Sequence, residues 1–193
     1  MPSLVTPAIS AGALAASGQP TLVMEGEALL RPWCLADAEA VVAAFRDPEI
    51  QRWHVRRADS VEEARTWIES WQSSWRDEAG GHWAVSGADG EGLLGRVSLK
   101  SLDLADGSAE VAYWMVPTAR GEGTCTRAVM TLTKWALEQA GFHRLELEHS
   151  MANQASCRVA IKAGFKTEGI RRGAALHADG WHDMHLHACV GQS

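Results

Sequence analysis

The segment at residues 117–127 (PTARGEGTCTR) has the residue types and spacing that could hold a phosphate group. It follows a strand-like run and opens a run with helical spacing, so several backbone N–H groups would point at one place. The positive end of the helix dipole would add to them, and glycine lets the backbone approach an anion without a Cβ in the way. The segment matches neither GxxxxGK[ST] nor GxGxxG, and a flexible turn before a helix is an equal alternative for its two glycines.

Composition excludes several other classes of protein. The 193 residues carry 18 Lys and Arg against 24 Asp and Glu, a net charge of −6, whereas a broad nucleic-acid surface needs a basic excess. This balance fits a cationic or amine-bearing substrate better. No apolar run approaches the ~18 residues that span a membrane. Four scattered cysteines without a CxxC pair, and no basic residue before Arg31 to start a secretory signal, predict a cytoplasmic protein with reduced thiols.

The elements that would position the segment form one domain at residues 21–193, after a flexible tail at residues 1–20. Strand-like and helical runs follow one another, and three short strands joined by Gly/Asp turns predict an antiparallel meander. We therefore expect an α/β or α+β fold. The predicted strands are residues 21–31, 82–86, 93–102, 110–116 and 145–148, with two more around Asp179-Gly180, and the predicted helices run from Asp37 to Asp47-Pro48, from Ser60 to near Gly80-Gly81, and over residues 123–140 and 155–163.

Two local signals mark the first helices. The residue before a proline is pushed out of the α region, so Asp47-Pro48 is expected to end the first helix. Residues 60–63 (SVEE) form a capping box, in which Ser60 accepts a hydrogen bond from a backbone N–H and Glu63 reaches back. We interpret the apolar stripe of the second helix as core packing rather than as a cation-binding cage. It consists of Ala64, Trp67, Ile68, Trp71 and Trp75.

Two motifs in the right order resemble the GCN5-related N-acetyltransferases (GNAT). Arg120-x-x-Gly123-x-Cys125 is similar to that family's [QR]-x-x-G-x-[GA] loop, with Cys125 where Gly or Ala is usual. The run from Asn153 through Ser156 to Gly164-Phe165 is similar to the second family signature, N-x-x-[AS]…G-F. Both motifs lie at the start of a predicted helix.

Further runs resemble one branch of the family, the ribosomal-protein alanine and serine acetyltransferases. These are residues 29–33 (LLRPW), Asp47-Pro48, Trp53 and residues 110–114 (EVAYW). The likeness covers about residues 21–190. It implies a mixed, mostly antiparallel sheet that is flanked by helices and splays between its fourth and fifth strands, with acetyl-CoA entering the splay.

The resemblance also implies which residues would contact acetyl-CoA. The backbone of Met115 and Val116, on the fourth strand, would pair with the pantetheine. Asn153 and Ser156 would line the pantetheine arm near the thioester. The pyrophosphate would lie on the backbone amides of Arg120, Gly121, Glu122, Gly123, Thr124, Cys125 and Thr126.

Transfer to an amine needs a base for the amine and a group that protonates the departing thiolate. Many relatives use a tyrosine seven residues after the signature asparagine, and here that position is Ala160. The only tyrosine is Tyr113 on a strand, so we expect Ser156 to be the hydroxyl donor, with a local bond to the backbone as its alternative. Glu110, at the start of the splayed strand, is expected to be the base, with a plain surface carboxylate as the alternative.

Three residues are candidates for contact with the acceptor amine. Trp53 and His54 lie in the loop between the first two helices, which forms the acceptor wall in relatives. His149 stands where the family usually has an apolar residue, and an imidazole there suits proton transfer. Glu148 and His149 are therefore also rivals of Glu110 for the role of base.

Three histidines in residues 182–187 (HDMHLH) raise the question of a metal site, because two histidines on one strand face can bind an ion. Strand alternation explains them more simply, and no metal is expected. In this reading Met184, Leu186 and Ala188 point inward, with Asp183, His185 and His187 on the other face.

The expected function is that of an acetyl-CoA-dependent N-acetyltransferase that acts on a protein N-terminal amine. One alternative keeps the chemistry with a small amine, such as an amino acid, an antibiotic or a polyamine. The other is a catalytically silent acyl-CoA-binding regulator, which the missing tyrosine and Cys125 permit. The expected partners are acetyl-CoA and the amine acceptor, without nucleic acid or membrane, and exposed tryptophan faces would favour a homodimer.

Overall fold

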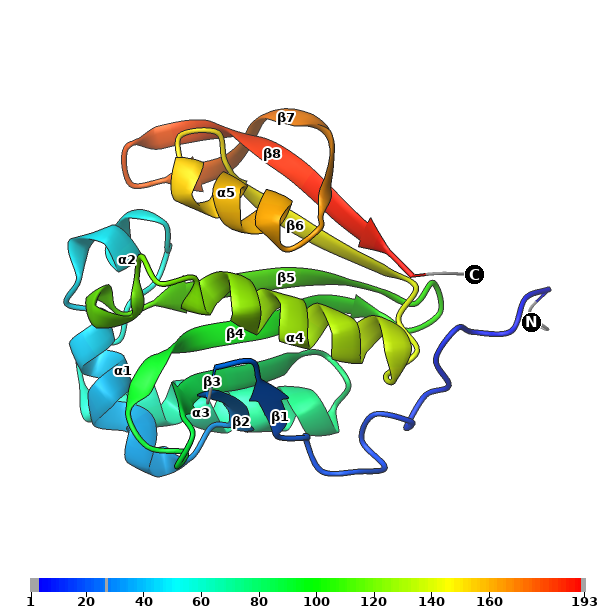
Figure 1. The fold of residues 1–193 in the computed structure, drawn as a ribbon, viewed down its shortest axis with the longest axis horizontal. Helices are drawn as coiled ribbons and strands as arrows, with labels where there is room; N and C mark the ends of the chain where they lie inside the picture. Colours follow the sequence, from blue (N-terminus) through cyan, green and yellow to red (C-terminus); the bar gives the residue numbers. More distant parts are fainter. Residues whose placement is uncertain (1–3, 27, 192–193) are drawn as a thin grey trace.

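The computed structural model describes residues 4–26 and 28–191. Within them one eight-stranded sheet has the strand order β1-β2-β3-β4-β5-β6-β8-β7 (Figure 1). The strands are β1 (Leu22–Met24), β2 (Ala28–Pro32), β3 (Gly81–Gly87), β4 (Leu93–Asp103), β5 (Ser108–Met115), β6 (Arg144–Ser150), β7 (Lys166–His177) and β8 (Gly180–Val190). The helices are α1 (Ala38–Ala44), α2 (Pro48–Arg52), α3 (Val61–Arg76), α4 (Thr124–Glu138) and α5 (Gln154–Lys162), with 3-10 turns at Leu35–Asp37 and Pro117–Ala119.

The sheet separates two hydrophobic layers. On one face α4 packs over the central strands, burying Ala128, Val129 and Leu132 against them. On the other face α1 and α3 bury Val41 and Ile68 in a second cluster. Figure 1 shows α4 in front of β4 and β5, with α3 behind the sheet. This mixed, mostly antiparallel sheet with flanking helices confirms the predicted fold class.

The N-terminal half follows the predicted meander with two differences. The first predicted strand is a hairpin of β1 and β2, because Gly26 turns the chain with φ +84°. Asp47-Pro48 starts a helix instead of only ending one, because Asp47 accepts a hydrogen bond from Ile50 N at 3.0 Å as the N-cap of α2 and proline suits the first helical position.

Helix α3 begins as its capping box predicts. Ser60 Oγ accepts a hydrogen bond from Glu63 N at 3.2 Å, while the Glu63 carboxylate reaches one residue further back, to Asp59 N at 2.7 Å. Its stripe faces inward, which confirms the core interpretation. Ala64, Ile68, Trp71 and Trp75 are buried, and Trp67 packs partly against them.

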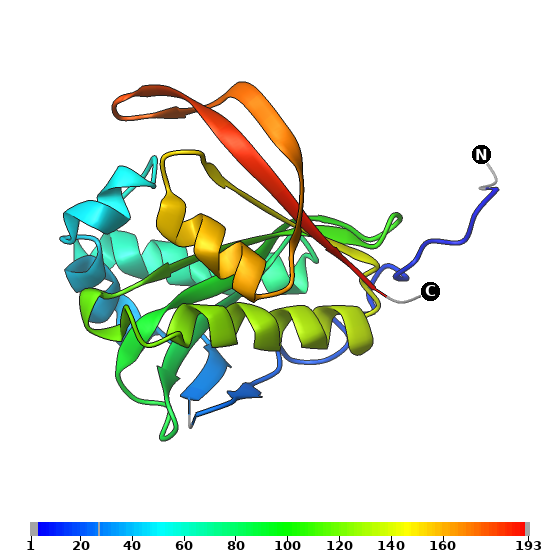
Figure 2. The same ribbon diagram turned by 45° about the horizontal axis from the view of Figure 1, so that its top comes forward.

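The predicted splay lies between β5 and β6. Because the sequence predicts β1 and β2 as a single strand, β5 and β6 are the fourth and fifth strands of that prediction. These strands are parallel and pair only from Ser108 to Glu110 on β5 and from Arg144 to Glu146 on β6. Beyond Glu110 they separate, so among the described residues the rest of β5 has no strand partner on that side. Figure 2 shows β6, β8, β7 and α5 diverging from the central strands there.

Within the segment predicted as a flexible tail, residues 8–20 lie along the domain, whereas residues 4–7 are exposed and extend away from it (Figure 1). Ile9 and Leu14 are buried in the main core cluster, and Ile9 N donates to Leu104 O at 2.9 Å. The flexibility of this segment stays a prediction. No helix in the described part of the chain is both long and apolar enough to cross a membrane.

Candidate functional site

The segment predicted to hold a phosphate group, residues 117–127, forms the turn between β5 and α4. Gly121 and Gly123 have φ values of +87° and +78°, which L residues with a side chain rarely adopt, so glycine is needed for this turn. Gly123 is the N-cap of a helix of 15 residues, whose first amides lack intrahelical partners. These amides and the helix dipole make the turn a fit place for a pyrophosphate.

Arg120 anchors the turn through its side chain. Its Nε donates to Met115 O at 3.0 Å, and its two terminal nitrogens contact the Asp47 carboxylate at 3.1 and 3.3 Å. Val116 N donates to Leu94 O at 3.0 Å. Val116 O accepts a hydrogen bond from Ala119 N at 3.0 Å. Three of the backbone groups expected to pair with pantetheine are therefore engaged within the protein, which leaves Met115 N for that role.

Arg127 is a residue of this turn to which the sequence analysis assigned no role. Its Nη1 donates to Glu122 O at 2.8 Å, and its Nη2 lies 3.4 Å from Thr124 Oγ1. Its buried Nε has no hydrogen-bond partner among the described residues. Its guanidinium adds positive charge beside the turn at the start of α4. The sequence signal that could have identified Arg127 was a basic residue directly after the glycine turn.

The second signature brings Ser156 to the only tyrosine. Asn153 caps α5, and its Oδ1 accepts a hydrogen bond from Ser156 N at 3.0 Å. The buried Ser156 hydroxyl lies 2.7 Å from the Tyr113 hydroxyl, so Tyr113 reaches this site from β5 rather than from the helix. Burial, with the Cys125 thiol nearby, raises the pKa of Tyr113 far above its usual value, and it stays protonated. Burial likewise raises the pKa of Cys125 to about 12.

Glu110 lies at the closed end of the splay, where β5 and β6 still pair. Its carboxylate forms an ion pair with Lys100 Nζ on β4 at 2.8 Å, and its side chain is 24% exposed. Because successive residues alternate between the faces of a strand, Glu110 and Tyr113 point to opposite faces of β5. Of its rival bases, Glu148 is bound to Arg171 Nη1 at 2.7 Å.

Trp53 and His54 lie beside an open hollow of about 480 Å³, of which His54 forms part of the lining. His54 Nδ1 lies 2.7 Å from Ile50 O, and burial lowers the pKa of His54, so the ring is neutral at pH 7. The Trp53 ring meets those of His177 and His182 edge to face, at 5.9 and 6.3 Å between centroids.

A hydrogen-bonded Ser–His–Asp array at the open end of the splay was missed by the sequence analysis. Ser150 Oγ, on the last residue of β6, lies 2.6 Å from His182 Nδ1, and His182 Nε2 lies 2.8 Å from Asp179 Oδ1. A carboxylate only accepts, so Nε2 carries the proton and Nδ1 accepts from the serine. Only the pairing of β6 with β8 brings these residues together.

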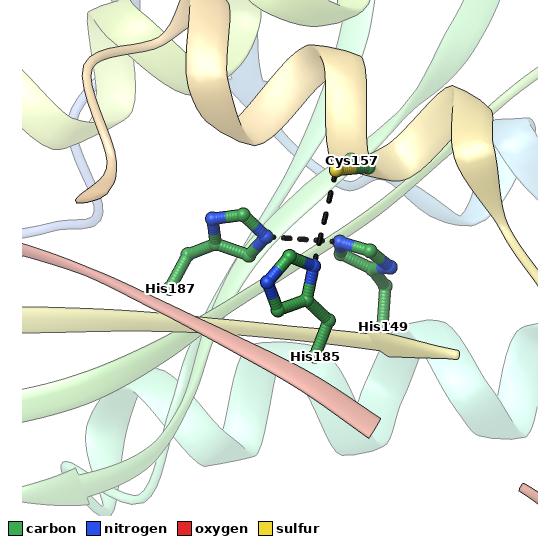
Figure 3. Close-up of side chains that lie close together, drawn as sticks. All are labelled: His149, Cys157, His185 and His187. Carbon is green, nitrogen blue, oxygen red and sulfur yellow. Dashed lines mark hydrogen bonds between the residues drawn. The ribbon is translucent and has the colours of Figure 1, made fainter. Parts of the chain in front are cut away.

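His149 points toward α5 and is not among the residues that line the hollow (Figure 3). It is 5% exposed, and its Nε2 lies 3.1 Å from His187 Nε2. Burial lowers the pKa of His149, and burial with the neighbouring imidazoles lowers the pKa of His187 to about 4. The expected orientation of β8 is wrong for His187, which is 0% exposed because α5 covers this face. The role of His149 as an acceptor contact stays a prediction.

Comparisons with known proteins define the class. The family profile of the acetyltransferase (GNAT) domain matches residues 28–166. The uncharacterized N-acetyltransferase YoaA of Bacillus subtilis is 26% identical over 145 residues, which are 75% of this chain and 82% of that protein. The ribosomal-protein-serine acetyltransferase of Escherichia coli is 26% identical over 98 residues, which are 51% of this chain and 55% of that protein.

Solved structures agree with this result. The ribosomal α-N-protein acetyltransferase RimL, in complex with coenzyme A, matches with a TM-score of 0.83 and 17% identity, over 89% of this chain and 98% of that one. The chain belongs to the GNAT family. It is an N-acetyltransferase, as its family and its named relatives show.

Proposed function

We propose that this enzyme transfers the acetyl group of acetyl-CoA to the N-terminal amine of a protein. The observation that carries the proposal is the glycine turn at the start of α4, which lies at the mouth of a splay whose β5 edge has no strand partner. The relatives named for ribosomal proteins support the choice of a protein acceptor, since RimL is described as a ribosomal α-N-protein acetyltransferase and the Escherichia coli relative as acting on ribosomal-protein serine.

Acetyl-CoA supplies an acetyl group activated as a thioester. The amides of Gly121 through Thr126 would hold its pyrophosphate, and Arg127 would add charge beside them. Arg120 would hold the turn in place rather than contact the substrate, because its guanidinium is hydrogen-bonded to Met115 O and ion-paired with Asp47.

The hydroxyl pair of Ser156 and Tyr113 is suited to stabilise the leaving thiolate. Tyr113 stays protonated and can donate to Ser156 Oγ, which frees the serine proton for a substrate sulfur. Ser156 is the donor expected from the sequence, and the proposal adds Tyr113 as the group that positions and polarises it.

Two groups could accept the proton of the amine, and they sit at opposite ends of the splay. Glu110 would act at the closed end, once its carboxylate has released Lys100 and contacts the acceptor amine instead. His182 would act at the open end, through the Ser150 hydroxyl that donates to its Nδ1. Asp179 holds His182 in the tautomer that this role requires.

The charge around the hollow favours an acceptor with acidic side chains behind its amine. Three arginines, Arg52, Arg56 and Arg57, line the hollow, and Arg57 forms an ion pair with Asp59 at 2.8 Å. Arg96 is not among the residues that line the hollow and lies over the Trp71 ring, but burial and, to a smaller extent, the charge of Arg96 lower the pKa of His54. This local positive charge differs from the net charge of −6, which suggested a cationic substrate.

An acceptor screen that reads release of the CoA thiol tests the proposal. We expect turnover with peptides that carry acidic residues at positions two to four, and a KM about tenfold higher for matched basic peptides. Arg56→Glu should remove this preference, whereas Arg65→Glu on the exposed side of α3 should keep it. Glu110→Gln and His182→Gln in the same assay identify the base by the larger loss of kcat.

Two results would overturn parts of the proposal. Turnover with small amines alone would exclude the protein acceptor. No turnover with any amine, although coenzyme A binds, would exclude transfer by the proposed mechanism.

A further inference from the structure

Three histidines and a cysteine meet beneath α5, apart from the glycine turn and the hollow. His149 comes from β6, His185 and His187 from β8, and Cys157 from α5. One ring nitrogen or sulfur from each of the four lies within 4.8 Å of the others. Figure 3 shows the three imidazoles converging from the strands and the thiol approaching them from the helix.

The strand register explains why these side chains converge. In the antiparallel pairing of β6 with β8, His149 is opposite His185, and Leu147 is opposite His187. The three histidines are thus neighbours on one face of the sheet. Helix α5 covers that face and places Cys157 Sγ 3.9 Å from His185 Nδ1. The site uses residues from both strands and the helix, so it forms only when this half of the domain is folded.

The outer nitrogens of two rings are held so that their inner nitrogens face each other. His149 Nδ1 lies 2.8 Å from Ser150 O, a carbonyl that only accepts, so Nδ1 carries the hydrogen and Nε2 is bare. His187 Nδ1 lies 3.4 Å from Thr167 Oγ1. The Nε2 atoms of His149 and His187 are 3.1 Å apart. Hydrogen bonds of this kind orient histidines that bind a metal in proteins.

We infer that His149, Cys157, His185 and His187 bind one Zn²⁺ ion. Three imidazole nitrogens and one thiolate form a four-coordinate N/S set of the kind that Zn²⁺ prefers. Zinc bonds of about 2.0–2.1 Å to nitrogen and 2.3 Å to sulfur place tetrahedral ligand atoms roughly 3.3–3.6 Å apart. The distances of 3.1 and 3.9 Å bracket this range, and the widest separation of 4.8 Å closes by about 1 Å on binding.

Burial also fits a bound ion with a route to solvent. His149 and His187 are buried, while Cys157 and His185 are half-buried and leave an approach. Zinc ligands bind as neutral imidazoles and thiolates, so Cys157 would lose its proton on binding. This inference replaces the expectation, drawn from strand alternation, that the histidines of β8 bind no metal.

The ion would act as a structural tie. It would join β6, β8 and α5, the elements that form one wall of the splay, and α5 carries Asn153 and Ser156 at its start. The zinc would therefore stabilise the wall that holds Ser156 without itself touching the substrates. This role does not depend on which acceptor the enzyme uses.

Metal binding by the full-length chain tests the inference. Protein stripped with a chelator is titrated with Zn²⁺ against a chromophoric chelator, and separately with Co²⁺ while its absorption spectrum is recorded. We expect one ion per chain with a Kd below about 1 μM, a higher Tm with Zn²⁺, and a thiolate-to-cobalt charge-transfer band. Cys157→Ser should abolish that band and weaken zinc binding by about 100-fold or more.

Two variants keep the test decisive. Cys34→Ser changes an exposed thiol outside the cluster and should bind both ions as the wild type does. His185→Asn, at a half-buried ligand, should weaken zinc binding even if Cys157→Ser fails to fold. The inference is wrong if stripped wild-type protein binds no zinc below about 10 μM, if its cobalt spectrum lacks a thiolate band, or if folded Cys157→Ser or His185→Asn binds zinc as tightly as the wild type.

Discussion

At the scale of single residues, Tyr113 on strand β5 places a phenol hydroxyl beside Ser156, although α5 has no tyrosine of its own. The helix position that carries tyrosine in many relatives is Ala160, which is fully buried here. The Tyr113 hydroxyl, from β5, instead reaches the first turn of α5, at 2.7 Å from Ser156 Oγ. The sequence named Ser156, but the role of Tyr113 depends on the distance between two elements, which no spacing along the chain reveals.

Substitutions at this pair separate donation from packing. Ser156→Ala should lower kcat by about 100-fold if, as proposed, the serine hydroxyl donates to the leaving thiolate. Helix α5 should stay intact, since Asn153 Oδ1 accepts from the backbone of residue 156 and not from its side chain. Tyr113→Phe should cost only about tenfold, because the serine hydroxyl remains. Steady-state rates with a saturating acceptor check both effects, with Ser70→Ala, at an exposed position on α3, as the control. Values of kcat within twofold of the wild type for both Ser156→Ala and Tyr113→Phe would contradict the prediction.

At the scale of elements, local signals predicted most of the helices and strands. The Ser60 cap starts α3, the tryptophan stripe faces the core, and Gly141 follows α4 with φ +85°. The errors arose where one residue type serves two purposes. Proline ends one helix and can begin the next, so Asp47-Pro48 was assigned only the first role.

The link between α2 and the glycine turn predicts that Asp47 affects the binding of acetyl-CoA from a distance. Asp47 caps α2 and forms an ion pair with Arg120 at 3.1 Å. Asp47→Asn keeps a cap but loses the charge, so the KM for acetyl-CoA should rise about two- to fivefold with little change in Tm.

Asp47→Ala also removes the cap and should cost about 1 kcal/mol of stability in addition. Chemical denaturation and initial rates on both variants measure the two effects. A KM for acetyl-CoA in Asp47→Asn equal to that of the wild type would show that the ion pair does not hold the turn.

At the scale of the whole molecule, the sequence fails where chain-distant segments meet. The histidines of β8 alternate regularly, and their burial follows only from the strand order β6-β8-β7 and from α5 above them. The array of Ser150, His182 and Asp179 depends on the same pairing. Of the nine tryptophans, Trp181 alone is largely exposed, at 69%. The homodimer was expected because of exposed tryptophan faces, so it stays a prediction that has lost this argument.

The N-terminal segment gives a last prediction at this scale, because one carboxylate fastens it to the domain. Glu78, just after α3, accepts hydrogen bonds from Gly12 N at 2.6 Å, Leu14 N at 2.7 Å and Ala15 N at 3.2 Å. These bonds lower the pKa of Glu78, so its ionised form is the one that holds the segment. Further along, Trp75 Nε1 donates to Ser17 O at 3.1 Å.

Glu78→Gln should release this segment while the sheet stays folded, because an amide oxygen accepts these bonds more weakly than a carboxylate. We expect hydrogen exchange at residues 12–15 to accelerate on the order of tenfold and limited proteolysis to cut within residues 4–20. Glu138→Gln, at an exposed position on α4, should leave both unchanged. Because Ile9 and Leu14 are part of the core, release should also lower Tm, and unchanged exchange in Glu78→Gln would mean that these apolar contacts hold the segment without the carboxylate.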